Sequence, residues 1–194
     1  YNTPVMRSEE GMPVGNGVMG SLIWTTPSTM RFQINRVDIF GNDASSNNFY
    51  ERHTDYCGGA GFVDIEFPGY AGVFSGNEFK QHLSCYDAVV TTEGKLVKTE
   101  TFVWSDKDVM AIHVEDNRNS QPVVRLRALR PAITKKGDHS AISKFSKDEN
   151  HIILEQTFAE KDFLCKSAVA ISVDGAEAKS WQMNDEEIIL TVKE

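Results

Sequence analysis

The chain has 194 residues, with 28 acidic and 20 basic side chains, a formal net charge of −8 and a sequence pI near 5.2. Its hydrophobic share of 40% and charged share of 25% are typical of globular proteins, which excludes global disorder. No apolar run approaches the roughly 18 residues that a membrane span needs, and the acidic balance argues against binding to nucleic acid, which requires clustered Lys and Arg.

Apolar residues recur with a period of two rather than 3.6, which predicts β-strands. Strands are expected, in chain order, at residues 21–26, 30–35, 63–67, 88–92, 97–103, 109–115, 124–128, 152–158, 169–173 and 188–192. Gly, Asn and Asp residues that favour turns separate these segments. Closely spaced strands without a helical stripe predict an all-β fold, either an antiparallel sandwich or a barrel. We expect one domain over residues 1–194.

Two segments interrupt the alternation. Residues 41–60 are polar and contain glycine without any period, and residues 68–76 form a second glycine-rich stretch. Both are predicted to be loops, and loops this long in a compact β-domain are usually functional or interfacial. The densest basic stretch (Arg125, Arg127, Arg130, Lys135 and Lys136) begins on a predicted strand, which favours a solvated strand face.

Residues 15–20 (GNGVMG) satisfy the GxGxxG pattern of dinucleotide sites. That site needs a strand before the glycines and a helix after them. Here Pro13 precedes the glycines and a β-prone segment follows, so a tight loop is favoured and no nucleotide cofactor is predicted.

No other motif in the sequence marks a catalytic or metal centre. The histidines lack metal-ligand spacing, and residues 53–57 (HTDYC) have no second ligand cluster, so no metal site and no cofactor are predicted. There is no GxSxG elbow. Cys57, Cys85 and Cys165 form no disulfide framework, so the sequence leaves their redox state open. Carboxylate pairs lie at turns, where acidic side chains cap backbone amides.

Aromatic residues could furnish a sugar-stacking surface, although most aromatic side chains in a sandwich pack its core. The candidates for stacking are Trp24, Trp104, Trp181, Tyr50, Tyr56, Tyr70 and Tyr86, and the favoured ones are Tyr50, Tyr56, Tyr70 and Trp181.

Residues 12–23 (MPVGNGVMGSLI) and 31–41 (RFQINRVDIFG) resemble the opening of glycoside hydrolase family 95, the α-L-fucosidase and α-L-galactosidase family, and of related hydrolases. Residues 81–90 resemble a later strand of that family, and residues 98–112 resemble one of its hairpins. Two positions depart from the pattern: Arg36 stands where the family usually has Glu, and Phe40 where it has Trp. The resemblance spans roughly residues 10–175.

The resemblance implies a two-sheet antiparallel β-supersandwich of the galactose-mutarotase-like class. It implies that catalysis belongs to a downstream (α/α)6 barrel, which supplies the acid and base and is absent from this chain, and that the protein is secreted or periplasmic. The start at Tyr1, without Met or a signal peptide, is interpreted as processing or truncation. No catalytic residue is nominated.

Three functions are therefore open. The favoured one is a non-catalytic N-terminal domain that packs on the barrel and shapes its substrate cleft. The alternatives are a stand-alone carbohydrate-binding module and a mutarotase-like epimerase, which would need a His and a Glu converging in a concave sheet.

Four polar residues, Asn16, Asn35, Arg36 and Asp38, lie in or beside the loops around residues 15–20 and 35–42. We expect them at one end of the sandwich, on the surface that faces the catalytic domain, with Asn35 near bound sugar. Arg36 and Asp38 are suited to an ion pair or a bidentate contact across the seam with that domain. The competing interpretation is local capping, with Asn16 holding a tight turn and Asp38 bonding nearby amides.

Overall fold

The computed structural model describes residues 1–43, 54–128, 132–136, 139–148, 151–160 and 162–193, except for the side chains of residues 40–43, 54–58, 134, 136, 139, 178–181 and 193. Within this part of the chain the only helices are two single 3-10 turns, η1 (Ser8–Glu10) and η2 (Gly76–Glu78). All strand pairs are antiparallel. The prediction of an all-β fold with little or no helix is confirmed.

Hydrogen bonds group the described strands into one seven-stranded and two four-stranded sheets. The seven-stranded sheet has the order β1 (Met12–Gly15), β2 (Met19–Thr26), β3 (Thr29–Asp43), β4 (Thr54–Glu66), β9 (Val123–Arg127), β15 (Glu187–Lys193) and β14 (Glu177–Met183). One small sheet contains β5 (Lys80–Ser84), β6 (Val89–Gly94), β7 (Val97–Val103) and β8 (Met110–Asp116). The other contains β10 (Ile133–Lys136), β11 (His139–Lys147), β12 (His151–Glu160) and β13 (Phe163–Ser172).

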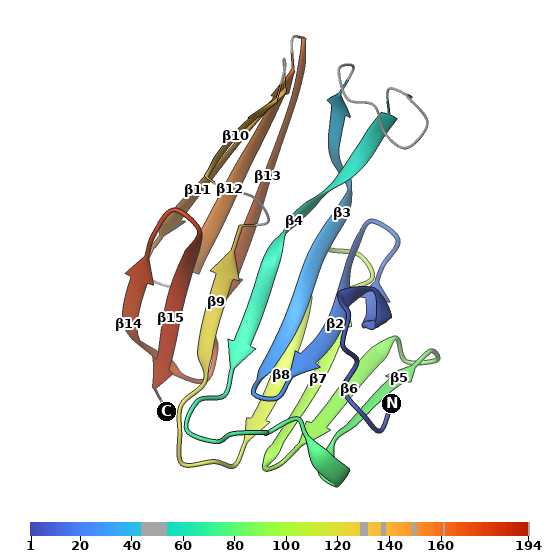
Figure 1. Cartoon of the computed structure of the whole chain (residues 1–194), viewed down its shortest axis with the longest axis vertical. Coiled ribbons are helices and arrows are strands. Elements are labelled where there is room, and N and C mark those ends of the chain that lie inside the picture. The colour runs from blue at the N-terminus through green and yellow to red at the C-terminus, as the bar shows by residue number, and fades with distance from the viewer. Residues whose placement is uncertain (44–53, 129–131, 137–138, 149–150, 161, 194) are drawn as a thin grey trace.

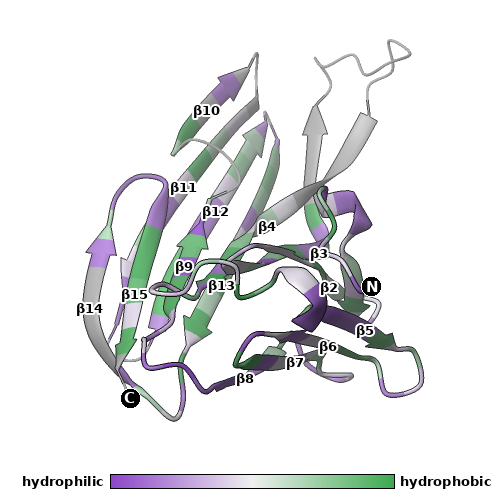
Figure 2. Cartoon of the chain, turned by 60° about the horizontal axis from the view of Figure 1, so that its bottom comes forward, coloured by the Kyte–Doolittle hydropathy of each residue, from purple (hydrophilic) through white to green (hydrophobic). Residues whose placement is uncertain are grey.

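The three sheets form two layers. Both small sheets lie against the same face of the seven-stranded sheet (Figure 1). Sheet β5–β8 lies by β1 and β2, whereas sheet β10–β13 contacts β3, β4, β9 and β15 (Figure 2). The expected sandwich is therefore present, and its second layer is divided into two separately hydrogen-bonded sheets.

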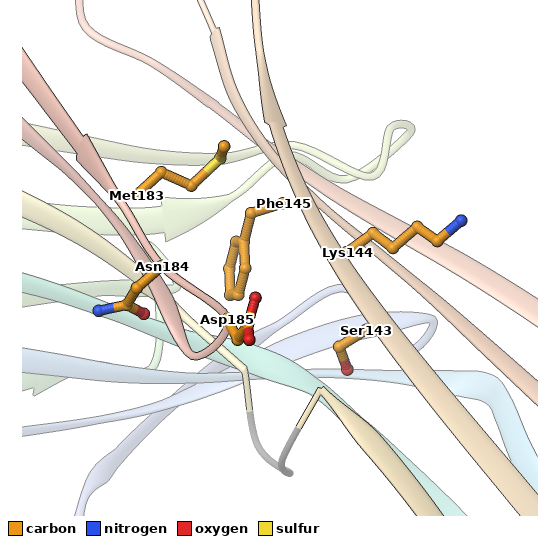
Figure 3. A pocket seen from close by; sticks show the side chains of 6 residues that line it. All are labelled: Ser143, Lys144, Phe145, Met183, Asn184 and Asp185. Atoms are coloured by element: carbon orange, nitrogen blue, oxygen red, sulfur yellow. The ribbon is translucent and has the colours of Figure 1, made fainter.

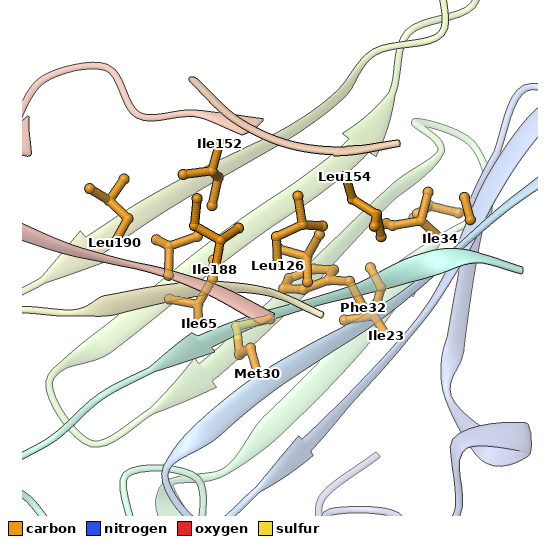
Figure 4. Close-up of a cluster of buried hydrophobic side chains, with 14 of the residues drawn as sticks. Ile23, Met30, Phe32, Ile34, Ile65, Leu126, Ile152, Leu154, Ile188 and Leu190 are labelled. Carbon is orange, nitrogen blue, oxygen red and sulfur yellow. The ribbon is translucent and has the colours of Figure 1, made fainter. Parts of the chain in front are cut away.

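A single core joins the layers. Met30, Phe32 and Ile34 alternate along β3 and are buried, because a period of two points all three side chains inward. The hydroxyl of Thr99, on β7, donates to Sδ of Met30 at 3.2 Å, while Leu154, on β12, packs in the same cluster near Ile34 (Figure 4). One face of β3 thus packs against both small sheets.

The outer face of the seven-stranded sheet carries a ladder of ion pairs. The buried carboxylate of Asp64 accepts from Nε of Arg127 at 2.7 Å. Arg125 binds both oxygens of Glu66, at 2.7 and 3.0 Å, and also reaches Glu187 at 3.2 Å. The hydrogen bond that Arg125 donates to Glu66 is the main cause that raises the pKa of Arg125. The two alternating arginines of the basic stretch are therefore matched by carboxylates, as expected of a strand face and not of a phosphate site.

Strand positions differ from expectation in several places. The loop expected over 41–60 is wrong at both ends, since β3 continues to Asp43 and β4 begins at Thr54; residues 44–53 lie outside the described chain. Residues 81–90, expected as one strand from the resemblance, are divided by a turn between β5 and β6 in which Ala88 has a φ of 56°. Strands β1, β10, β11 and β14 were not anticipated, because their short or polar segments carry little alternation.

Candidate functional site

The first candidate residue, Asn16, joins two distant turns. Its Oδ1 accepts from the backbone N–H groups of Val18 (3.0 Å) and Met19 (2.9 Å), which closes the turn between β1 and β2. Its Nδ2 donates to the carbonyls of Trp104 (2.9 Å) and Lys107 (3.2 Å) in the turn between β7 and β8. The capping interpretation of Asn16 is therefore correct, and the same carboxamide also ties the seven-stranded sheet to sheet β5–β8.

The glycines of the GxGxxG segment serve this hairpin. Gly17 has a φ of 90°, in the left-handed region that glycine adopts without steric cost. Gly15 pairs with Gly20, and a Cβ on either would come within about 3 Å of a backbone carbonyl, 2.9 Å at Gly15 and 3.0 Å at Gly20. The segment is a tight turn, as predicted, although it links β1 to β2 instead of leading into the first strand.

Strand β3 changes its pairing at the other candidates. Asn35 pairs with Gly59 of β4, but the next pair is Phe40 with Cys57, so residues 36–39 lie opposite one residue of β4. On its other side β3 remains bound to the first hairpin, with Arg36 paired with Met19 and the N–H of Val37 donating to the carbonyl of Val18 at 3.0 Å. This irregularity is a β-bulge with several extra residues on β3, and such bulges redirect side chains.

Arg36 connects the bulge to the β7–β8 turn. Its Nη1 lies 2.9 Å from Oδ2 of Asp38, and its Nη2 lies 3.2 Å from Oδ2 of Asp108. The backbone carbonyl of Asp38 also accepts from Sγ of Cys165, on β13, at 3.6 Å. The bulge is therefore the place where all three sheets meet. Arg36 and Asp38 thus pair with each other inside the chain, whereas a contact across a seam with another domain stays a prediction. Within the described chain, the carboxylate of Asp38 accepts no hydrogen bond from a backbone amide.

Exposed apolar side chains surround these polar groups. Val18, Val37, Trp104 and Val109 are 41%, 60%, 50% and 47% exposed. The backbone hydrogen bonds Val37 to Val18 and Trp104 to Val109 (2.9 Å) place them on adjoining segments. We call the four side chains, together with Asn16, Arg36, Asp38 and Asp108, the junction patch. Aromatic, aliphatic and Arg side chains in this combination are typical of contact surfaces.

Asn35 lies beside the junction patch on the outer face of the seven-stranded sheet, opposite to the inward-facing Ile34. It pairs with Gly20 on β2 and Gly59 on β4, so no cross-strand side chain flanks its carboxamide. The side chain is half-buried. The structure thus brings Asn16, Asn35, Arg36 and Asp38 together at one place in the fold, as the sequence analysis expected.

Among the side chains that it describes, the structure does not place a favoured aromatic residue on an exposed surface where a sugar could stack. Tyr70 is half-buried against the core, with Nζ of Lys95 at 5.0 Å from its ring centre. Tyr50 and the side chains of Tyr56 and Trp181 lie outside what the structure describes. The exposed aromatic residue at the junction is Trp104, which belonged to the wider set of aromatic candidates but not to the four favoured ones. The sequence does indicate that Trp104 is exposed. Lys98, Glu100, Phe102 and Trp104 occupy alternate positions in 97–104, so Trp104 shares the outward face of the two charged residues.

One pocket lies elsewhere, between β11 and the turn joining β14 to β15. Its volume is about 320 Å³, and it is lined by Ser143, Lys144, Phe145, Met183, Asn184 and Asp185. Lys144 and Asn184 point away from Phe145 on opposite sides (Figure 3). Its polar groups do not converge as those of a ligand site do.

The described residues were also searched for other chemistry. They contain no cluster of potential metal ligands. Cys85 is a free, exposed thiol and Cys165 a free, half-buried one, while the side chain of Cys57 is not described. His113 lies 3.5 Å from Glu115, but both side chains are more than half exposed on β8, at the edge of its sheet. Within that part, no helix is long and apolar enough to cross a bilayer.

The fold is an antiparallel β-sandwich domain whose junction patch gathers polar, aliphatic and aromatic side chains at the surface. A family model described as a domain of unknown function (DUF5703) matches residues 1–165 of the 194. The chain therefore belongs to the DUF5703 family, and the matched segment contains the whole junction patch. A comparison with curated proteins gave no match.

Proposed function

We propose that this chain is the non-catalytic β-sandwich domain of a secreted or periplasmic glycoside hydrolase. In this role it packs on a catalytic (α/α)6 barrel in the same polypeptide and forms one wall of its substrate cleft. The proposal is supported by the resemblance of residues 12–23 and 31–41 to family 95 openings, together with an all-β sandwich of the kind that the resemblance implies.

The observation that carries the proposal is the junction patch. Its exposed valines, Val18 and Val37, lie beside a guanidinium that is already held by two carboxylates. A pre-ordered Arg next to exposed apolar groups suits docking, because little side-chain freedom remains to be lost when a partner closes over it.

The test uses the protein encoded by the complete gene and, beside it, the 194-residue chain alone. We expect the complete protein to contain a helix-rich segment after Glu194 and to hydrolyse nitrophenyl glycosides, and the chain alone to be inactive. Val37→Asp should lower kcat/KM by about tenfold or more, since an unpaired charge in a closed interface costs a few kcal/mol.

Leu164→Asp is the matched control, because Leu164 is also 60% exposed but lies on β13, facing away from the core. It should leave activity within twofold of the wild type. Equal effects of the two substitutions, a gene without a helical segment, or turnover by the 194-residue chain would each contradict the proposal.

A stand-alone carbohydrate-binding module is the second candidate. It is favoured by one observation, the half-exposed indole of Trp104 beside polar side chains. A gene that ends without a catalytic segment, combined with saturable binding of oligosaccharides, would favour this function over the first.

A further inference from the structure

Trp104 is an exposed aromatic side chain, and several hydrogen bonds hold the turn that carries it. Its N–H donates to the carbonyl of Val109 at 2.9 Å, and its carbonyl accepts from Asn16 at 2.9 Å. The carbonyl of Lys107 accepts from both Asn16 and the N–H of Val109. The indole is therefore presented on a fixed turn, with Nζ of Lys107 at 6.0 Å from its ring centre, and half of its surface stays open to solvent.

The turn that carries Trp104 also presents carboxylate oxygens. Asp108 belongs to this turn, and Arg36 joins it to Asp38. Arg36 contacts one oxygen, Oδ2, of each carboxylate, and both side chains are about half exposed, at 57% for Asp38 and 51% for Asp108. Each carboxylate consequently retains an oxygen that can accept a hydrogen bond from a ligand hydroxyl.

This combination selects a class of ligand. A pyranose ring has an apolar face of C–H groups that stacks on an indole, and a rim of hydroxyl donors that suits fixed carboxylates. The guanidinium of Arg36 is already paired with both carboxylates, so it is not free to bind a phosphate or another anion. A purely apolar partner would cover the indole while leaving the remaining carboxylate oxygens without hydrogen bonds.

We propose that Trp104, with Asp38 and Asp108 held by Arg36, forms a binding site for an uncharged pyranose. The site deepens the proposed function and rests on it, because it names the residues through which this wall of the cleft contacts the carbohydrate. Trp104 stacks on the sugar ring, the two carboxylates accept its hydroxyls, and Asn16 is a positioning residue that holds the turn.

The proposal is tested on the 194-residue chain labelled with ¹⁵N. The probes are the methyl pyranosides of fucose, galactose and glucose and neutral oligosaccharides built from them. We expect at least one probe to shift the indole N–H resonance of Trp104 in a saturable manner. That resonance is assigned by its loss in Trp104→Phe.

Variants distinguish stacking on Trp104 from non-specific contact of sugars with exposed aromatic side chains. Trp104→Ala should weaken binding at least tenfold, and Trp104→Phe should weaken it less because an aromatic face remains. Asp108→Asn should weaken binding severalfold at unchanged circular dichroism. Tyr86→Ala is the control, since Tyr86 is 97% exposed on the β5–β6 turn, and it should have no effect.

The absence of any saturable shift across the panel, or equal affinity of Trp104→Ala and the wild type, would overturn this proposal. The result is independent of the docking test. If no sugar shifts the Trp104 resonance but Val37→Asp still lowers hydrolysis by the complete protein, the pyranose site is refuted and the docking role is kept. If a sugar binds at Trp104 but the gene contains no catalytic segment, the docking role is refuted and the pyranose site is kept.

Discussion

Asn16 and Asn35 show that one residue type can serve two purposes in neighbouring parts of one sheet. The carboxamide of Asn16 makes four hydrogen bonds, two inside its own turn and two to the β7–β8 turn. Asn35 sits between two glycines, and its carboxamide makes no hydrogen bond within the described chain. The first side chain is thus built into the structure, whereas the second is available to a partner or ligand.

The two asparagines give a matched pair of substitutions. Asn16→Ala should lower the free energy of unfolding by about 1–2 kcal/mol, because it removes the acceptor of the Val18 and Met19 N–H groups and the two hydrogen bonds to the β7–β8 turn. Asn35→Ala should change stability by less than about 0.5 kcal/mol and instead impair activity or docking in the complete protein. Thermal unfolding of the isolated chain distinguishes them, at about 2–4 °C for each kcal/mol. A large stability loss in Asn35→Ala would assign it a purely structural role.

At the scale of elements, β7 and β8 combine a buried face with an exposed row of charges. Val97, Thr99 and Thr101 point inward, while Lys98 and Glu100 point outward. Nζ of Lys98 lies 2.9 Å from Oε1 of Glu100. The hydrogen bond from Lys98 and then its charge lower the pKa of Glu100, and the same hydrogen bond raises the pKa of Lys98.

The lowered pKa of Glu100 predicts a pH dependence. A carboxyl whose pKa is lower in the folded state contributes stability above its unfolded pKa, about 4.3, and loses it as the pH falls through the folded value. NMR titration should place the midpoint of Glu100 below the ordinary glutamate value, and Lys98→Met should raise it. Lys144→Met, in another sheet, is the control. The shift should shrink in 1 M salt, since the pair is exposed; a midpoint unaffected by Lys98→Met would contradict this attribution.

At the scale of the whole molecule, the layers are joined by polar as well as apolar contacts. Gln156, on β12, is 3% exposed, and its Nε2 donates to the carbonyl of Ala60, on β4, at 2.6 Å. Ala60 lies between Gly59 and Gly61, which pair with consecutive residues of β3, so its backbone is displaced from the regular ladder. A side chain from the opposite layer therefore supplies a donor where the sheet is irregular.

Gln156→Leu should lower the free energy of unfolding by about 1–3 kcal/mol, because a buried carbonyl loses its donor without access to water. Thr157→Val, next along β12 and facing outward, should stay within about 0.5 kcal/mol. Urea unfolding at constant m-value measures both. Similar midpoints for the two variants would show that the Gln156–Ala60 contact contributes little to the association of the layers.

The local pattern of the sequence was sufficient for the fold class and for the orientation of many side chains. Residues 97–103 alternate in the sequence as they do in burial, because side chains of a strand point to opposite faces whatever the rest of the chain does. The tight turn at residues 15–20 was likewise predictable, because glycine and asparagine favour such conformations locally. Alternation failed for β11, whose serines and lysine dilute the apolar signal.

The grouping of strands into sheets, and with it the junction patch, was decided by tertiary structure. Asn16 and Lys107 are 91 residues apart in sequence and are joined only when β1 and β7 pack against each other. The sequence predicted that Asn16, Asn35, Arg36 and Asp38 would share one place, because strand pairing keeps neighbouring turns close. It could not show that Trp104 and Asp108 complete that place, since periodicity determines which face of a strand a residue occupies, whereas the packing of one sheet on another determines which distant residues it meets.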